Sequence, residues 1–402
     1  MRDLFNQALL PSAGVSTKNP IRRSDNEFYR YYAGYPLDFA TWALSELGLP
    51  SSAVIVDPWS GSGTTAAACA HAGTSCYGYD INPVMVHLGR ARVALDTDFE
   101  EAAEIISNTK DLLRCRGVTE FREIGHAFRE IPVTNETAHS VAIAALFPFA
   151  RSQLEQWRSR NPSWYSRHST FEGLQVEAGA VCDNWIKLLK TLKQWRSVSE
   201  KSPGCAIVIE RGDSRKAIGR FNTFDGVLTS PPYLTRLDYV HATLPEFLLL
   251  RDFDLAPDIQ RLRRSMLGSP LTSERPAQSI ERLPDDVRGV LERIKRHASK
   301  ASSTYYLRFF ATYFVDLQAS IRNIGNALKS GGSGCIVAQP TSYKDITIDL
   351  PDLIASLANQ FGLFEYSRYT FDSRRSMSLV NTRAHANARL PKAESAVFFR
   401  KE

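Results

Sequence analysis

The stretch that decides the fold is Asp57-Pro58-Trp59-Ser60-Gly61-Ser62-Gly63-Thr64-Thr65. The apolar run at residues 54–56 before it is typical of a buried strand, and residues 64–72 after it have a helical pattern. Glycines at 61 and 63 let the backbone turn sharply and let a ligand approach the main chain where a Cβ would collide. The sequence therefore predicts a strand, a ligand-binding loop and a helix in succession.

Three classes of ligand use a loop of this kind. A phosphate-binding P-loop needs a lysine before its Ser/Thr, and Gly63 is followed by two threonines, which disfavours nucleotide hydrolysis. A dinucleotide stays open, because residues 61–66 fit the Gly-x-Gly-x-x-Gly/Ala pattern. S-adenosylmethionine is favoured, because Asp57 at the strand end can contact the methionine ammonium, whereas it would repel a pyrophosphate.

Further apolar runs at residues 76–79, 206–210, 226–229 and 334–338 alternate with helical stretches, which predicts a parallel sheet covered by helices. Asp80 ends the strand expected at residues 76–79, where its carboxylate can bind both ribose hydroxyls. Asp213 follows the next strand and can accept a hydrogen bond from the adenine amino group. For each aspartate, a helix N-cap or a turn is the alternative.

A second motif, Thr229-Ser230-Pro231-Pro232-Tyr233, ends the strand expected at residues 226–229. Proline cannot continue a central strand, so the chain stops there and presents this motif at the same sheet edge as the glycine loop. An exocyclic amine of a base is a poor nucleophile, because its lone pair is delocalised into the ring. Ser230 Oγ and the Pro231 carbonyl can each accept one N–H bond and aim that lone pair. Proline rigidity at 232 holds the acceptors, and the Tyr233 ring can stack on a flipped base.

Together the two motifs resemble those of the amino-methylating DNA methyltransferases of bacteria and phages. The aromatic segment at residues 28–36, Leu328 to Gly332 before a late strand, and the closing run Ala396 to Arg400 are similar too. The resemblance implies a Rossmann-like α/β fold, S-adenosyl-L-methionine as cofactor, no metal, and catalysis by Ser230, Pro231, Pro232 and Tyr233. The cofactor site that we predict comprises Asp57, Pro58, Trp59, Gly61, Ser62, Gly63, Thr64, Thr65, Asp80, Ile81, Asp213 and Tyr32.

The same resemblance implies double-stranded DNA as the partner, within a restriction-modification or defence system. In this family a serine at the position of Ser230 is associated mainly with methylation of cytosine N4, and aspartate or asparagine with adenine N6. Adenine N6 and the guanine amino group of tRNA stay open as alternative targets, and a non-catalytic DNA-binding protein on this fold is a remote one. Cytosine C5 is excluded, because its methylation needs a thiol, usually in a Pro-Cys dipeptide, and no cysteine here follows a proline.

Five parts are expected along the chain: 1–97 with the cofactor loop, 98–205 as a mainly helical insertion, 206–250 with the catalytic motif, 251–304 as a basic insertion, and 305–402 completing the sheet. Residues 258–300 hold ten basic and six acidic side chains, which suits target recognition on DNA, although a solvated helix pair would look the same. The first insertion carries tryptophans and arginines that suit base stacking, although a helical core is the competing interpretation.

The bulk composition agrees with a soluble protein that meets a polyanion. The 402 residues carry a formal net charge of +6, and 43% of them are hydrophobic. The six cysteines are scattered without the short spacing of a zinc site, and no stretch has the length and apolar character of a membrane span or a secretion signal. We expect a reduced, cytoplasmic protein.

Overall fold

The computed structural model describes residues 15–17, 29, 34–117, 121–159, 165, 178–198, 200, 204–235, 237–271, 277–372 and 393–402. Tyr32 and most of the aromatic segment at residues 28–36 lie outside this described part, as do several of the aromatic and basic side chains of the first insertion.

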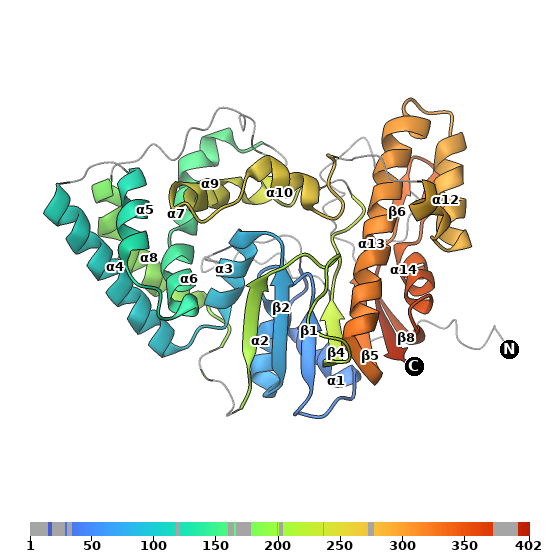
Figure 1. The fold of residues 1–402 in the computed structure, drawn as a ribbon, viewed down its shortest axis with the longest axis horizontal. Helices are drawn as coiled ribbons and strands as arrows, with labels where there is room; N and C mark the ends of the chain where they lie inside the picture. Colours follow the sequence, from blue (N-terminus) through green and yellow to red (C-terminus); the bar gives the residue numbers. More distant parts are fainter. Residues whose placement is uncertain are drawn as a thin grey trace.

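Within the described part of the chain, a sheet of seven strands forms the centre of the molecule, in the order β3-β2-β1-β4-β5-β9-β8 (Figure 1). Its strands are β1 Val54–Asp57, β2 Ser75–Asp80, β3 Ile207–Arg211, β4 Phe224–Thr229, β5 Leu328–Ala338, β8 Leu363–Asp372 and β9 Ala393–Lys401. The first five are parallel, and β9 runs antiparallel to both β5 and β8. The predicted Rossmann-like, mostly parallel sheet is confirmed.

Helices cover both faces of this sheet. The helices of the described part of the chain are α1 Leu37–Glu46, α2 Thr64–Ala72, α3 Pro83–Arg92, α4 Asp96–Arg116, α5 Phe121–Glu130, α6 Glu136–Ala144, α7 Phe147–Leu154, α8 Ala178–Trp195, α9 Leu244–Asp252, α10 Ile259–Ser265, α11 Ala277–Glu281, α12 Asp285–Arg296, α13 Leu307–Ala327 and α14 Leu350–Asn359. Two short strands, β6 Thr341–Tyr343 and β7 Ile346–Ile348, form a separate hairpin.

Two apolar clusters pack on opposite faces of the sheet, because successive side chains of a strand point to opposite sides. Ile55 and Leu228 pack on one face with α1 and α2, whereas Val56 and Val227 pack on the other with α13 and α14. Strands buried on both faces read as continuous apolar runs, which is why short sequence patterns located them.

Helices α4 to α8 lie between α3 and β3 in the sequence and form a third cluster with α3 and α9. In Figure 1 they stand to one side of the sheet, and α9 and α10 lie above the strand tips. Among the described residues, no helix is long and apolar enough to cross a membrane.

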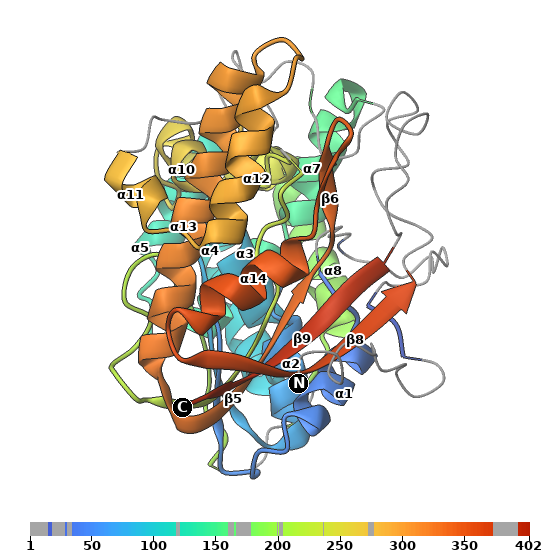
Figure 2. The same cartoon turned by 90° about the vertical axis from the view of Figure 1, so that its right-hand side faces the viewer.

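The strand beginning at Leu328 corrects one expectation. We predicted Leu328 to Gly332 as a segment before the late strand, but these residues belong to β5 itself. Gly332 and Gly334 make this possible, because a Cβ at either position would lie within 3.0 Å of atoms of the neighbouring β4 strand. Figure 2 shows β8 and β9 side by side at the edge beyond β5.

Candidate active site

The glycine loop connects β1 to α2 at the carboxyl edge of the sheet. Gly61 and Gly63 have φ angles of 50° and 81°, in the left-handed region that favours glycine. A Cβ on Gly63 would also lie 2.8 Å from Gly89 Cα, so this glycine lets α2 and α3 approach closely. Within the loop, Gly63 N donates to the Ser60 carbonyl over 2.9 Å, which closes a tight turn.

Asp80 ends β2 beside this loop. Its Oδ2 accepts a hydrogen bond from Gly61 N at 3.0 Å, and its Oδ1 accepts one from Asn82 N at 2.8 Å. Burial raises the pKa of this carboxyl to about 6. An ionised carboxylate has about four lone-pair sites, so acceptor capacity remains for the two hydroxyls of a ribose. Ile81, next to it, packs against the cluster of the helical insertion.

Asp57 is almost completely buried, at 2% exposure, and its hydrogen bonds come from the chain itself. Oδ1 accepts from Thr229 Oγ1 at 2.6 Å and from Trp59 N at 3.2 Å, and Oδ2 accepts from Thr65 Oγ1 at 2.5 Å. The Tyr35 hydroxyl lies 2.6 Å from the same Thr65 oxygen. Burial raises the pKa of Asp57 to about 6, and these hydrogen bonds oppose the rise. Its contacts join the end of β1, the loop, α2 and the end of β4.

Asp213 lies two residues beyond β3 and is held by Arg215. Arg215 Nε donates to Oδ1 at 2.9 Å and Nη2 to Oδ2 at 2.8 Å, and Nη1 reaches Asp316 at 3.0 Å. Burial opposes ionisation of Asp213, but the arginine outweighs it and lowers the pKa of that carboxyl. The predicted contact with an adenine amino group would share a carboxylate that is already ion-paired.

The rest of the loop is largely buried, and two of its polar atoms have no hydrogen-bond partner among the described residues. Pro58 is buried, Ser62 is 7% exposed, and Thr64 Oγ1 accepts a hydrogen bond from Arg92 at 2.8 Å. Among the described residues, the Trp59 indole Nε1 and the Ser60 hydroxyl are buried without a hydrogen-bond partner. Buried polar groups are usually paired, so these two atoms fit a polar ligand held at the loop.

The Ser-Pro-Pro-Tyr motif leaves the end of β4 next to the loop. Pro231 is buried, and Ser230, Pro232 and Tyr233 are partly buried. Three contacts fix the backbone: Tyr313 Oη donates to the Pro232 carbonyl at 2.9 Å, Tyr233 N donates to Tyr239 Oη at 3.0 Å, and Thr235 N donates to the Tyr233 carbonyl at 2.8 Å. The motif is therefore rigid for reasons beyond its prolines.

The Tyr233 side chain forms a hydrogen bond with Glu394, a residue that was not predicted from the sequence. Its hydroxyl donates to Glu394 Oε1 at 2.7 Å, and Glu394, in β9, is 1% exposed. Burial raises the pKa of Tyr233 well above its ordinary value, and Glu394 adds to that rise. A glutamate two residues before the apolar run at residues 396–399 was the signal that could have found it.

The loop after the motif is fixed by a buried ion pair. Arg263 Nε of α10 donates to Asp238 Oδ2 at 2.8 Å, and the exposed fractions of the two side chains are 10% and 4%. Arg263 is thus one basic residue of the second insertion whose charge is used inside the protein. Its neighbours Arg261 and Arg264 are exposed on the same helix.

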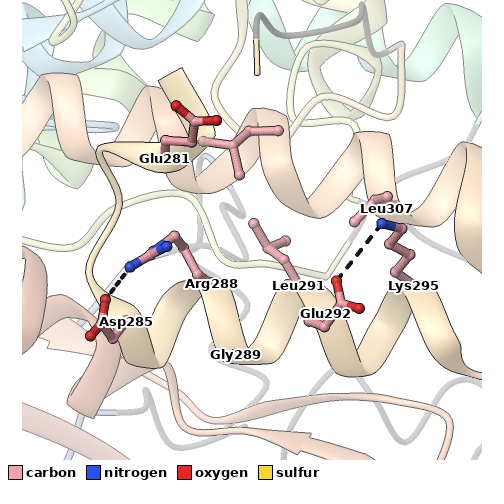
Figure 3. Close-up of a pocket in the computed structure, with 9 residues that line it drawn as sticks. Glu281, Asp285, Arg288, Gly289, Leu291, Glu292, Lys295 and Leu307 are labelled. Atoms are coloured by element: carbon pink, nitrogen blue, oxygen red, sulfur yellow. Dashed lines mark hydrogen bonds and ion pairs between the residues drawn. The ribbon is translucent and has the colours of Figure 1, made fainter. Parts of the chain in front are cut away.

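One pocket of about 550 Å³ lies between α11, α12 and the start of α13 (Figure 3). Arg288 and Lys295 line it together with Glu281 and Glu292, so its charges are mixed. None of the predicted site residues lines it. The candidate site is instead the sheet edge, where the Thr229–Asp57 hydrogen bond holds the Ser-Pro-Pro-Tyr motif beside the glycine loop.

Comparison with known proteins gives distant relatives. No model of a known protein family matches the chain. The chain is 22% identical over 386 aligned residues to the Type II methyltransferase M.AvaI of Nostoc sp. and to the protein of the same name from Anabaena variabilis, covering 83% of this chain and 78% of each relative.

Solved structures with some likeness include a putative sarcosine dimethylglycine methyltransferase from Galdieria sulphuraria, with a TM-score of 0.34 and 9% identity over 91% of this chain and 85% of that one. Another is the rRNA methyltransferase aviRa from Streptomyces viridochromogenes, with a TM-score of 0.34 and 11% identity over 96% of each chain. Likeness at this level does not bear on substrate.

Proposed function

We propose that this protein is an S-adenosylmethionine-dependent DNA methyltransferase that modifies the exocyclic amino group of a flipped base, with cytosine N4 as the favoured target. The observation that carries the proposal is the Thr229–Asp57 hydrogen bond of 2.6 Å, which holds the Ser-Pro-Pro-Tyr motif beside the glycine loop. The 22% identity to a Type II methyltransferase over most of both chains supports methyl transfer as the reaction.

The cofactor is S-adenosyl-L-methionine, which supplies an electrophilic methyl group on a sulfonium when bound. Asp80 has the remaining acceptor capacity to hold the ribose hydroxyls, and the Gly61–Gly63 turn presents main chain to the ligand. The buried Trp59 Nε1 and Ser60 hydroxyl are further polar atoms available to the ligand. Asp57 fixes the loop through its hydrogen bonds with Trp59 and Thr65, and its predicted contact with the ammonium would be additional to that role.

The chain's own residues act on the target amine. Ser230 Oγ and the Pro231 carbonyl each accept one N–H bond, which draws the nitrogen lone pair out of the ring and aims it at the methyl group. The Tyr233 ring stacks on the flipped base. The acceptors reorganise little during the reaction, because Tyr313 and Tyr239 bind the carbonyl and the N–H of the Pro232–Tyr233 peptide, which follows them directly.

The choice of cytosine N4 as target rests on Ser230, because in the family that the motifs resemble a serine at this position is associated mainly with that target. Double-stranded DNA is the partner that we propose, with a restriction or defence system as the setting. The exposed Arg261 and Arg264 on α10 are candidates for phosphate contact, because α10 lies above the strand tips and Arg263 binds it to Asp238 in the loop after the Ser-Pro-Pro-Tyr motif.

The test is incubation of the purified protein with tritiated S-adenosylmethionine and duplex DNA of mixed sequence, with tRNA in parallel, followed by nucleoside digestion and mass analysis. Label in N4-methylcytosine from DNA is the expected result. N6-methyladenine would keep the mechanism and change the target. Label in tRNA alone would overturn the DNA assignment, and absence of label from both would overturn the enzyme assignment.

A further inference from the structure

Arg215 connects the loop after β3 to two other elements of the protein. Its Nε and Nη2 donate to the two oxygens of Asp213 at 2.9 and 2.8 Å, which is the bidentate arrangement of an arginine on a carboxylate. Nη2 also donates to the Ser265 carbonyl at the end of α10 at 2.6 Å, and Nη1 donates to Asp316 of α13 at 3.0 Å. Three elements therefore fix the orientation of this guanidinium, and the guanidinium fixes the carboxylate that it holds.

The hydrogen bonds of Asp213 leave one acceptor position open. Its Oδ1 accepts from Arg215 Nε and from Arg215 N at 3.1 Å, whereas among the described residues its Oδ2 accepts only from Nη2. A carboxylate has about four lone-pair sites, so one remains on Oδ2. Burial opposes ionisation of Asp213, but Arg215 lowers the pKa of that carboxyl. With 17% of its side chain exposed, Asp213 offers an ionised acceptor to a ligand at the sheet edge.

The position of Asp213 matches the order of the groups in the cofactor. Strands β1, β2 and β3 are neighbours in the sheet, and Gly212 N donates to the Asp80 carbonyl at 3.0 Å, so Asp213 follows directly beside the end of β2. The glycine loop, Asp80 and Asp213 therefore succeed one another along the carboxyl edge. In S-adenosyl-L-methionine the methionine, the ribose and the adenine succeed one another in the same way, so the adenine end corresponds to Asp213.

We propose that Arg215 is a positioning residue that holds the Asp213 carboxylate for the amino group of the adenine, and so makes the cofactor site select a 6-amino purine. This inference rests on the proposed function, with S-adenosyl-L-methionine as the cofactor. An amino group donates to the open position on Oδ2, whereas a 6-oxo group only accepts and is repelled by the carboxylate. Lysine cannot replace Arg215 in this role, because a single ammonium does not form the fork that fixes both carboxylate oxygens.

Two stable ligands test the selectivity without any methyl transfer. S-adenosyl-L-homocysteine carries the 6-amino group, and S-inosyl-L-homocysteine carries an oxo group in its place. Isothermal titration calorimetry gives the dissociation constant of each. We expect the wild-type protein to bind the adenosyl ligand about tenfold or more tightly than the inosyl ligand, the factor for one hydrogen bond to a charged group.

Substitution of either partner should reduce this selectivity. Asp213→Asn replaces the obligatory acceptor by an amide that can also donate to the 6-oxo group, so the ratio of the two dissociation constants should fall to near one. Arg215→Lys keeps the positive charge but loses the fork, so the carboxylate rotates freely and the ratio should fall about fivefold or more. Arg220→Lys is the matched control, because Arg220 is exposed in the same loop between β3 and β4, and it should keep the wild-type ratio.

Equal weakening of both ligands in Arg215→Lys, at an unchanged ratio, would give Arg215 a merely structural role and overturn this inference. A wild-type protein that binds both ligands equally would overturn it too, because the amino group would then have no partner at Asp213. Should Arg215→Lys fail to fold in thermal melting, Asp213→Asn still decides, since a wild-type ratio in that variant would leave Arg215 nothing to position. Failure of the proposed function is distinct, because it would appear as a wild-type protein that binds neither ligand or transfers no methyl group to DNA.

Discussion

Thr229→Val removes one hydroxyl from the junction between the Ser-Pro-Pro-Tyr motif and the glycine loop. Thr229 is fully buried, and its Oγ1 donates to Asp57 Oδ1 at 2.6 Å. Valine has nearly the same shape, so the substitution creates little empty space and acts mainly on this hydrogen bond. Losing a hydrogen bond to a buried charged group costs about 1.5–3 kcal/mol. We expect the free energy of unfolding to fall by about 2 kcal/mol at pH 8.

The pH dependence of this loss follows from the ionisation of Asp57. Folding raises its pKa to about 6, from about 3.9 in an unfolded chain. Its neutral form therefore stabilises the fold below about pH 4, and that contribution, on the order of 3 kcal/mol, is lost as pH rises through about 6. The Thr229 hydrogen bond opposes this pKa rise. Without it the pKa rises further, so the cost of the substitution grows above pH 6 and is small near pH 4.

Urea denaturation at pH 5 and pH 8, followed by circular dichroism, measures the loss of unfolding free energy and its change with pH. Thr347→Val is the matched control, because Thr347 is exposed on β7 and the same atom is exchanged. The control should stay within about 0.5 kcal/mol of the wild type. Equal losses in the two variants at pH 8, or a loss for Thr229→Val that does not grow with pH, would refute the account of this junction.

Three further predictions concern the site and the loop behind it. Asp80→Asn should weaken S-adenosylmethionine binding about tenfold or more by isothermal titration calorimetry, because the carboxylate loses charge-assisted hydrogen bonds to the ribose; unchanged affinity would remove Asp80 from the cofactor site. Ser230→Ala should abolish methyl transfer in the tritium assay while cofactor affinity stays at the wild-type value, and a loss of affinity would contradict its assignment to the amine. Arg263→Met should lower the free energy of unfolding by about 3–5 kcal/mol, because it leaves Asp238 buried without its cation. Arg264→Met, at an exposed position of the same helix, should have little effect on stability. Equal effects of the two substitutions would contradict the buried ion pair.

The features that could be predicted from the sequence are local in the chain. The strand, glycine turn and helix around residues 54–72 follow one another directly, so apolar pattern and backbone freedom were sufficient to find them. The same holds for β4 and the motif that ends it, because two prolines stop a strand wherever they stand. Each of these predictions needed only neighbouring residues.

Long-range partners could not be predicted, because they depend on strand order and direction. Nothing near Glu394 in the sequence indicates that β9 reverses and brings it to Tyr233. Tyr313 reaches the Pro232 carbonyl from the middle of α13, and tyrosine in an apolar helix is ordinarily part of a core. The start of β5 at Leu328 is a similar case, since its polar and glycine residues join the strand because the missing Cβ atoms let β4 approach closely.

The three aspartates at the carboxyl ends of the strands show why position alone does not give a role. Asp57 and Asp80 end parallel strands, Asp213 lies two residues beyond one, and from the sequence each was a candidate cofactor ligand. Asp213 is ion-paired through both oxygens to Arg215, and Asp57 is buried under three hydrogen bonds from its own chain. Asp80 is partly exposed and receives one backbone hydrogen bond on each oxygen. Substitution of Asp80 should therefore act first on ligand affinity, and loss of the Asp57 contacts first on stability, so the two effects can be separated by experiment.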